Sequence, residues 1–202
     1  MKNIFLFFII ASTLFSLYGM EKAQPATRDA LIHAVRLPDA KEVERLLKAG
    51  ANPNAKWDTP PGVNVLHFLS YNFNTLGEEV NEAYLSIIRS LLQHGADVNI
   101  RDSQESTPLM YAAGLWEKDD VISLLLDNDA QPNLQNKAGA TALMTAAGYG
   151  HAGTVDILLK RGADKTLRNN AGETALDVAR KEKAKALSFE HDKYDAVIRL
   201  LE

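Results

Sequence analysis

Residues 148–153, Gly-Tyr-Gly-His-Ala-Gly, have the G-x-G-x-x-G spacing of a dinucleotide-binding loop. In such a loop the glycines follow a buried strand and open a helix whose N-terminus holds a pyrophosphate, and an acidic residue further along binds the ribose. Glu173 lies 20 residues after Gly153. The elements on either side must therefore decide whether this motif can hold a nucleotide.

The histidines form no catalytic or metal-binding pattern. None belongs to an H-E-x-x-H pair, and none stands with a carboxylate at metal-ligand spacing. The chain has no cysteine, which excludes a thiol nucleophile, disulfides and thiolate-bound zinc or iron–sulfur clusters. Serine-hydrolase elbows and phosphate-binding P-loops are absent too. We expect no enzyme activity, no cofactor and no metal. The histidines are His33, His67, His94, His151 and His191.

Composition places the chain among ordinary folded proteins. It has 202 residues, of which 46% are hydrophobic and 24% are charged, and its formal net charge is −4. This length suits one domain or a short repeat array. The acidic balance argues against a nucleic-acid-binding surface.

The N-terminus differs from the rest of the chain. Met1–Asn3 carries one lysine, and residues 4–17 contain no charge. An apolar run of this length is short for a membrane-spanning helix, which needs about 20 residues. Residues 1–19 are therefore predicted to be a secretory signal peptide, and an uncleaved anchor is the alternative. Export would place the mature chain in a bacterial periplasm or outside the cell, with no membrane attachment once the signal is removed.

The remainder repeats with a period near 33 residues. A Thr-x-Leu-x-x-Ala block recurs, with its threonines 34 and 33 residues apart, and a Leu-Leu-x-x-Gly-Ala block alternates with it. An asparagine lies four residues after the glycine position in three copies. The first block occurs at 107–113, 141–147 and 174–179, the second at 46–52, 91–97, 125–130 and 158–164, and the asparagines are Asn54, Asn99 and Asn133.

Each block has a clear local role. Thr107 followed by Pro108 is a helix-capping hydroxyl with proline at the first helical position. Leucines and alanines then recur at helical spacing. Gly50, Gly95 and Gly162 stand where a second helix must end in a left-handed conformation, and Asp129 takes that position in one repeat.

Together these blocks resemble the ankyrin repeat, and the resemblance covers essentially all of residues 20–202. It implies an all-α solenoid of about five stacked helix-turn-helix repeats. We expect residues 20–202 to form one ankyrin-repeat domain. The predicted repeats are 27–56, 57–101, 102–135, 136–168 and 169–202.

The repeat register changes the interpretation of the glycine motif. Residues 141–147 are then predicted to be a helix rather than a strand, and the glycines are predicted to lie in a turn between two helices. The ankyrin consensus has Gly-His at this turn, which Gly150 and His151 match. Nucleotide binding is therefore not expected. His67 matches the consensus histidine, which implies a structural role between repeats.

Departures from the period mark individual features. The second repeat has about ten extra residues, which we place between its two helices around 71–81. They are either a recognition loop with exposed aromatic residues or a surface insertion whose Phe73 packs back onto the stack. Residues 180–185 are a basic run, which we favour as a solvated helix extension over an acidic-partner site. Trp116 is either an exposed anchor or a residue that stiffens its turn.

The resemblance implies that the chain binds another protein through a concave face made of loop tips and first helices. An apolar band of Tyr71, Leu115 and Tyr149 is expected across the central repeats. A monomer is expected. The predicted contact residues are Trp57, Tyr71, Phe73, Arg101, Ser103, Leu115, Trp116, Gln135, Lys137, Tyr149, Arg168 and Asn170.

Alternative functions remain open at this point. An exported protein of this type could neutralise a toxin or hydrolase, assist an enzyme under oxidative stress, or act on host proteins. A hydrolase with its site in the insertion of the second repeat is a further hypothesis from a different class.

Overall fold

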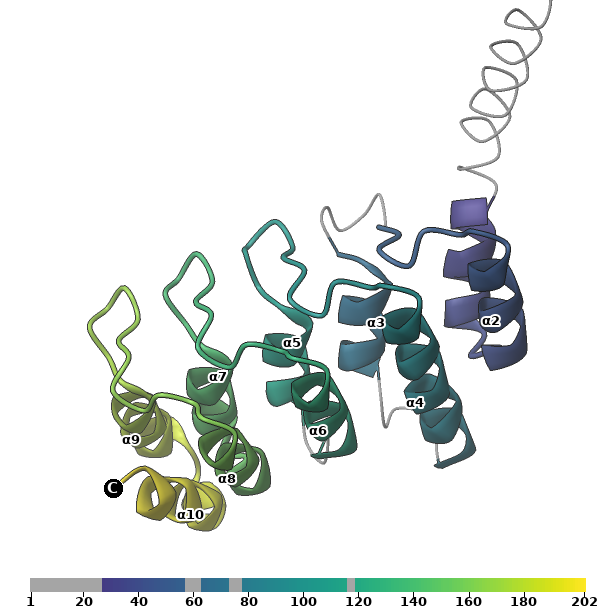
Figure 1. The fold of residues 1–202 in the computed structure, drawn as a ribbon. Coiled ribbons are helices and arrows are strands. Elements are labelled where there is room, and N and C mark those ends of the chain that lie inside the picture. Colours follow the sequence, from purple (N-terminus) through teal and green to yellow (C-terminus); the bar gives the residue numbers. More distant parts are fainter. Residues whose placement is uncertain (1–26, 57–62, 73–77, 116–118) are drawn as a thin grey trace, which may run out of the picture.

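The computed structural model describes residues 27–56, 63–72, 78–115 and 119–202, and the part so described is helical apart from one isolated bridge between Lys56 and Asn64. Figure 1 shows helices lying side by side in a single row of pairs. The prediction of an all-α solenoid is confirmed. Residues 27–36 are helical and are followed by α2 (Ala40–Lys48), α3 (Val65–Asn72), α4 (Glu78–Gln93), α5 (Pro108–Ala113), α6 (Asp119–Asp127), α7 (Ala142–Tyr149), α8 (Ala152–Lys160), α9 (Ala175–Lys185), the short 3-10 helix η1 (Ser188–Glu190) and α10 (His191–Leu201).

The predicted threonine caps begin three of the first helices. The hydroxyls of Thr107, Thr141 and Thr174 each accept a hydrogen bond from the backbone N–H three residues later. At α9 the Asp177 carboxylate also accepts from the Thr174 N–H, which completes a capping box. These bonds satisfy amide groups that a helix start otherwise leaves without partners.

The second helices end in left-handed residues, as predicted. Gly50, Gly95 and Gly162 have φ values of 89°, 85° and 84°, and Asp129 adopts φ 65° in the same position. In each case the next residue donates its N–H to a carbonyl five residues earlier, for example Ala163 to Leu158 at 2.9 Å. A left-handed residue thus closes the helix and turns the chain toward the next repeat.

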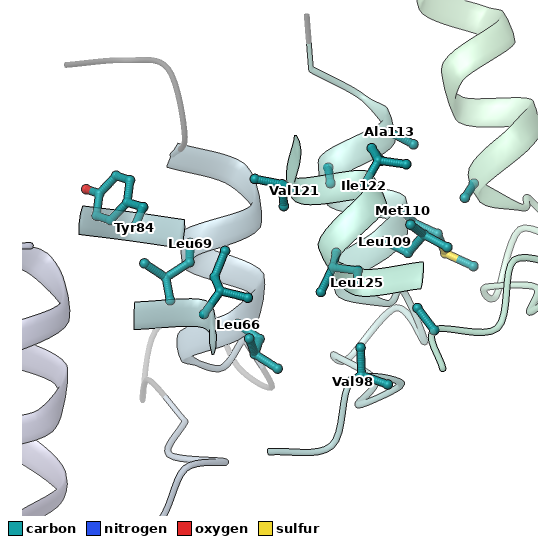
Figure 2. Packing of buried hydrophobic residues seen from close by; sticks show 14 of the residues in the cluster. Leu66, Leu69, Tyr84, Val98, Leu109, Met110, Ala113, Val121, Ile122 and Leu125 are labelled. Atoms are coloured by element: carbon teal, nitrogen blue, oxygen red, sulfur yellow. The ribbon is translucent and has the colours of Figure 1, made fainter. Parts of the chain in front are cut away.

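The helices stack in two lines. The first helices α3, α5, α7 and α9 contact one another in order, and so do the second helices α2, α4, α6, α8 and α10. Close approach of α5 and α7 is possible because the paired alanines, Ala112–Ala113 and Ala146–Ala147, are fully buried and small. Figure 2 shows Leu66, Leu109 and Ile122 within one continuous core. Each helix pair thereby covers the apolar face of its neighbour.

The recurring asparagines join successive repeats. Asn99 accepts the Gln131 N–H at 2.8 Å and donates to the Asp129 carbonyl at 3.1 Å. Asn133 makes the equivalent bonds to Asp164 and Gly162 one repeat later. Their spacing in the sequence is thus explained by a hydrogen-bonded ladder along one edge of the stack.

The second repeat corrects the expected position of its extra residues. The insertion was predicted to lie between two helices around residues 71–81, but α4 begins at Glu78. This helix has 16 residues, whereas α6 and α8 have 9 each. Much of the extra length therefore extends the second helix, and the buried Tyr84 anchors that extension to the core.

The last helix pair closes the stack with ion pairs. The basic run extends α9 to Lys185, as favoured from the sequence. Lys183 pairs with Asp195 at 2.5 Å and Arg180 pairs with Glu202 at 2.8 Å. These ion pairs join α9 to α10 and to Glu202, which follows it.

Candidate functional site

Loops on one edge of the stack precede the first helices and project to the same side (Figure 1). Each is shaped by an acidic or amide side chain whose oxygen accepts two backbone N–H groups, from residues two and four positions later. These side chains are Asp102, Asn136 and Asn169. Adjacent loops are also joined directly, since the Lys137 N–H donates to the Gln104 carbonyl at 2.9 Å. The loops therefore form a braced row.

Three of the predicted contact residues take part in this bracing. Arg101 donates to the Gln135 carbonyl at 3.2 Å, and Gln135 donates to the Arg168 carbonyl at 2.8 Å. Asn170 donates to the Lys137 carbonyl at 2.9 Å. Their side chains therefore hold neighbouring loops together, a role that sequence spacing alone did not reveal.

The other predicted loop residues are exposed. Ser103, Lys137 and Arg168 all lie at the surface of the row. The Arg168 guanidinium donates to the Gly172 carbonyl at 2.5 Å within its own loop. Trp57, Phe73 and Trp116 fall outside the described residues.

Below the loops, α3, α5 and α7 surround a shallow hollow of about 450 Å³. The predicted apolar band of Tyr71, Leu115 and Tyr149 meets there, although the three residues come from three different repeats. We call this feature the aromatic hollow. Its lining is Tyr71, Ser106, Met110, Tyr111, Gly114, Leu115, Asn136, Thr145 and Tyr149.

Two of the tyrosines project into solvent. Tyr71 is 55% exposed and Tyr149 is 57% exposed. The Tyr149 ring lies against Gly114, where an added Cβ would sit 3.5 Å from it, and it stacks on His151 with ring centroids 5.7 Å apart. Tyr149 thus lies across the boundary between two repeats.

Tyr111 forms part of the lining and was not predicted. Its ring meets Tyr71 edge-on at 6.3 Å and His67 at 5.1 Å. Its hydroxyl donates to Asp102 Oδ2 at 2.8 Å. Burial, followed by this bond, raises the pKa of Tyr111 to about 12, so the phenol stays protonated. Tyr111 occupies the position of the Thr-Pro-Leu block that differs between repeats, and this is the sequence signal that could have indicated it.

His67 has the structural role that its sequence position implied. Its Nε2 lies 2.9 Å from the Ser106 carbonyl of the next repeat, and its Nδ1 lies 2.8 Å from Asn64 Oδ1. Burial is the main cause of a lowered pKa at His67. This buried ring links the second and third repeats under the aromatic hollow.

Charge is distributed unevenly between the central first helices and the second helices, whereas the last first helix, α9, is rich in charged residues. The helices α3, α5 and α7 contain no Asp, Glu, Lys or Arg. By contrast, α4 has three glutamates and one arginine, and α6 has three aspartates and no basic residue. A partner that covers α3, α5 and α7 would therefore displace water from few charged groups, which lowers the cost of binding there.

The glycine motif lies in helical surroundings. Gly148 is inside α7 and Gly153 is inside α8, so only Gly150, with φ 78°, occupies the turn where all three were expected. The preceding element is a helix rather than the buried strand that a dinucleotide site requires. An Nδ1 contact of 3.2 Å joins His151 to the Ala113 carbonyl, which ties this turn to the previous repeat.

Among the described residues, no group of three or more His, Cys, Asp or Glu side chains has an arrangement that suits a metal ion. Within the same ranges, no helix combines the length and apolarity needed to cross a membrane.

Comparison with known proteins identifies the repeats. The family model for ankyrin repeats (3 copies) matches residues 31–136, 76–169 and 109–199. The chain is 34% identical over 111 residues to ankyrin repeat protein L86 of Acanthamoeba polyphaga mimivirus, covering 50% of this chain and 19% of that protein. It is 32% identical over 133 residues to dauer abnormal formation protein 25 of Caenorhabditis elegans, covering 65% and 31%.

A third relative is protein phosphatase 1 regulatory subunit 12A of Rattus norvegicus, with 30% identity over 106 residues, 52% of this chain and 10% of that protein. The chain thus spans between a tenth and a third of the length of these relatives. The family model itself covers most of the chain and coincides with the stacked helix pairs. The chain therefore belongs to the ankyrin-repeat family, whose repeats generally mediate protein–protein interaction.

Proposed function

We propose that this chain is a non-catalytic binding protein that docks a partner protein on the face formed by α3, α5 and α7. One observation carries the proposal: half-exposed tyrosines from separate repeats gather in a hollow between helices that contain no charged residue. Tyrosine supplies a large contact area at small entropic cost, and uncharged surroundings make desolvation inexpensive. The braced loops above the hollow would form the polar rim.

Affinity capture tests this surface. Immobilised protein is exposed to an extract of the organism that encodes it, and bound proteins are quantified by mass spectrometry. We expect a stoichiometric partner whose recovery falls at least about tenfold for the Tyr71→Ala/Tyr149→Ala double variant, since hot-spot tyrosines often contribute that much.

A matched control is available at the far end of the stack. Leu187 and Phe189 are 63% and 78% exposed, so Leu187→Ala/Phe189→Ala removes a similar apolar surface away from the hollow. Recovery should not change in this control. If capture instead depends on Leu187 and Phe189 and survives loss of the tyrosines, the docking surface has been misplaced.

We further propose that the protein is exported, of the secreted or periplasmic bacterial type, and that residues 1–19 act as its signal peptide. The lysine near the start and the uncharged residues 4–17 support this. Mass spectrometry of the exported protein should find an N-terminus near residue 20. An intact Met1 on protein from the cytosolic fraction would contradict it.

The class of partner that we favour is an enzyme whose activity the chain modulates. A relative's name, protein phosphatase 1 regulatory subunit 12A, describes a regulatory subunit, and an inhibitory or assisting role agrees with a protein that offers a docking face. The activity of a captured enzyme should change when the chain is added at equimolar concentration, and the tyrosine double variant should fail to change it.

A further inference from the structure

We propose that the aromatic hollow binds an arginine side chain presented by the partner. This inference rests on the proposed docking face and adds the chemistry of the contact made at its centre.

The rings supply the attractive surface. Tyr71, Tyr111 and Tyr149 line one hollow, and the faces of phenol rings carry partial negative charge. A guanidinium is planar and weakly hydrated, so it stacks on such rings more readily than an ammonium. Among the described residues, no basic side chain lines the hollow, so a guanidinium meets no like charge from them.

A carboxylate lies at the hydroxyl end of the Tyr111 ring. Asp102 accepts the Tyr111 hydroxyl at 2.8 Å and two backbone N–H groups from its own loop. It forms no ion pair with a Lys, Arg or His side chain of the described ranges, and its basic neighbour Arg101 pairs with Glu105 at 3.1 Å. A phenol that donates to a carboxylate becomes more electron-rich, which strengthens the attraction between Tyr111 and a cation.

Charge complementarity therefore favours a cation over an apolar side chain in this hollow. An apolar side chain would gain no electrostatic attraction from Asp102. A guanidinium would be attracted to the Asp102 carboxylate and would contact the tyrosine rings at the same time. The uncharged α3, α5 and α7 do not oppose that field.

The neighbouring repeats supply a conservative variant. Asn136 and Asn169 stand where Asp102 does, and each accepts the same pair of backbone N–H groups through Oδ1. Asp102→Asn should therefore keep the loop in place while it removes the charge. Tyr149→Ala removes one ring, and Phe189→Ala is the control for loss of an exposed aromatic residue elsewhere.

The test uses N-acetyl-arginine methylamide as the probe and the citrulline equivalent as its neutral isostere. Ring signals of the tyrosines are followed by NMR at low ionic strength, because salt screens an exposed contact. We expect saturable shifts with arginine in the millimolar range and binding of citrulline weaker by about threefold to tenfold. Asp102→Asn and Tyr149→Ala should reduce arginine binding, and Phe189→Ala should not.

Equal binding of arginine and citrulline, or an unchanged affinity in Asp102→Asn, would overturn the proposal. Tighter binding of N-acetyl-leucine methylamide would overturn it in favour of an apolar occupant. These outcomes differ from failure of the docking face: if capture depends on the two tyrosines but arginine does not bind, the face stands and only the arginine contact is wrong. If arginine binds but capture of the partner does not depend on the tyrosines, the assignment of the docking face is wrong.

Discussion

At the scale of single residues, Asp129 occupies a left-handed position at which three other repeats have glycine. Glycine closes α2, α4 and α8 at φ values between 84° and 89°, whereas Asp129 adopts φ 65° after α6. A side chain with a Cβ is strained in this region, although aspartate tolerates it better than most residues. The third repeat therefore carries a small conformational cost that the other repeats avoid.

Asp129→Gly should stabilise the protein by about 0.5–1 kcal/mol, because glycine relieves this strain even though it gains entropy in the unfolded chain. The Asn99 bond to the backbone carbonyl of this residue does not depend on its side chain. Urea unfolding would measure the gain, and the reverse substitution Gly162→Asp should destabilise. A loss of stability in Asp129→Gly would mean that the aspartate side chain contributes more than its strain costs.

His67 should make stability depend on pH. Burial lowers its pKa below the usual 6.5, against the opposing effect of the Ser106 carbonyl. As pH falls, the unfolded chain takes up a proton near pH 6.5 and the folded protein does so only at lower pH. The free energy of unfolding is therefore retained above about pH 6.5 and declines from there down to the folded pKa.

Urea unfolding of wild type and His67→Met between pH 8 and pH 5 checks this dependence. Met110 and Met144 occupy the corresponding buried positions in the next two repeats, so methionine suits the site. Between pH 6.5 and pH 5, the free energy of unfolding should decline less in the variant than in the wild type. His151, whose pKa burial also lowers, accounts for some of the remainder. An unchanged decline would show that His67 is not its source.

At the scale of elements, the first helices are short and depend on their caps. The helix α5 has only 6 residues and α7 has 8, lengths at which an isolated helix is not stable in water. Capping, and burial of one face against the neighbouring helices, must therefore supply the stabilising free energy that intrinsic helix propensity does not.

Thr141→Ala should destabilise the protein by about 1 kcal/mol, because it leaves the Met144 N–H without its partner at the start of α7. Thr141→Ser keeps the hydroxyl and should recover most of the loss. Thermal unfolding followed by circular dichroism gives the comparison. Equal stability of the serine and alanine variants would show that the methyl group of Thr141, which is buried, matters more than the cap.

At the scale of the whole molecule, the main contacts of each described helix pair are with its neighbours in the row. The free energy of unfolding is then approximately the sum of the stability of each repeat and of each interface between repeats. The interfaces make unfolding cooperative. The asparagine ladder and the continuous core together make those interfaces (Figure 2).

Asn133→Ala should weaken the interface between the third and fourth helix pairs by about 0.5–1.5 kcal/mol, because the exposed Asp164 N–H and Gly162 carbonyl both lose their protein partner. Hydrogen exchange should rise in α6 and α8, which flank this interface, before it rises in α2 and α3. Asn128→Ala, which removes a bond within its own repeat to the Leu124 carbonyl, is the matched control. Uniform exchange across the array would contradict a local role for Asn133.

Much of the fold could be predicted because its signals are local. The caps at Thr107, Thr141 and Thr174 and the left-handed residues at Gly50, Gly95 and Gly162 are confirmed, since each depends on bonds within a few residues of chain. The start of α4 at Glu78 was missed, because the extra residues of the second repeat were assigned to a connection, whereas the buried Tyr84 packs the added turns onto the core.

The sequence by itself determined the repeat, the helix ends and the apolar residues that face the core, because a period near 33 residues and short-range hydrogen bonds fix them. Only the tertiary structure decided that Tyr111 joins Tyr71 and Tyr149, and that Gln135 braces two loops. These features depend on contacts between residues some 30 to 40 positions apart, which become close only when one repeat stacks on the next.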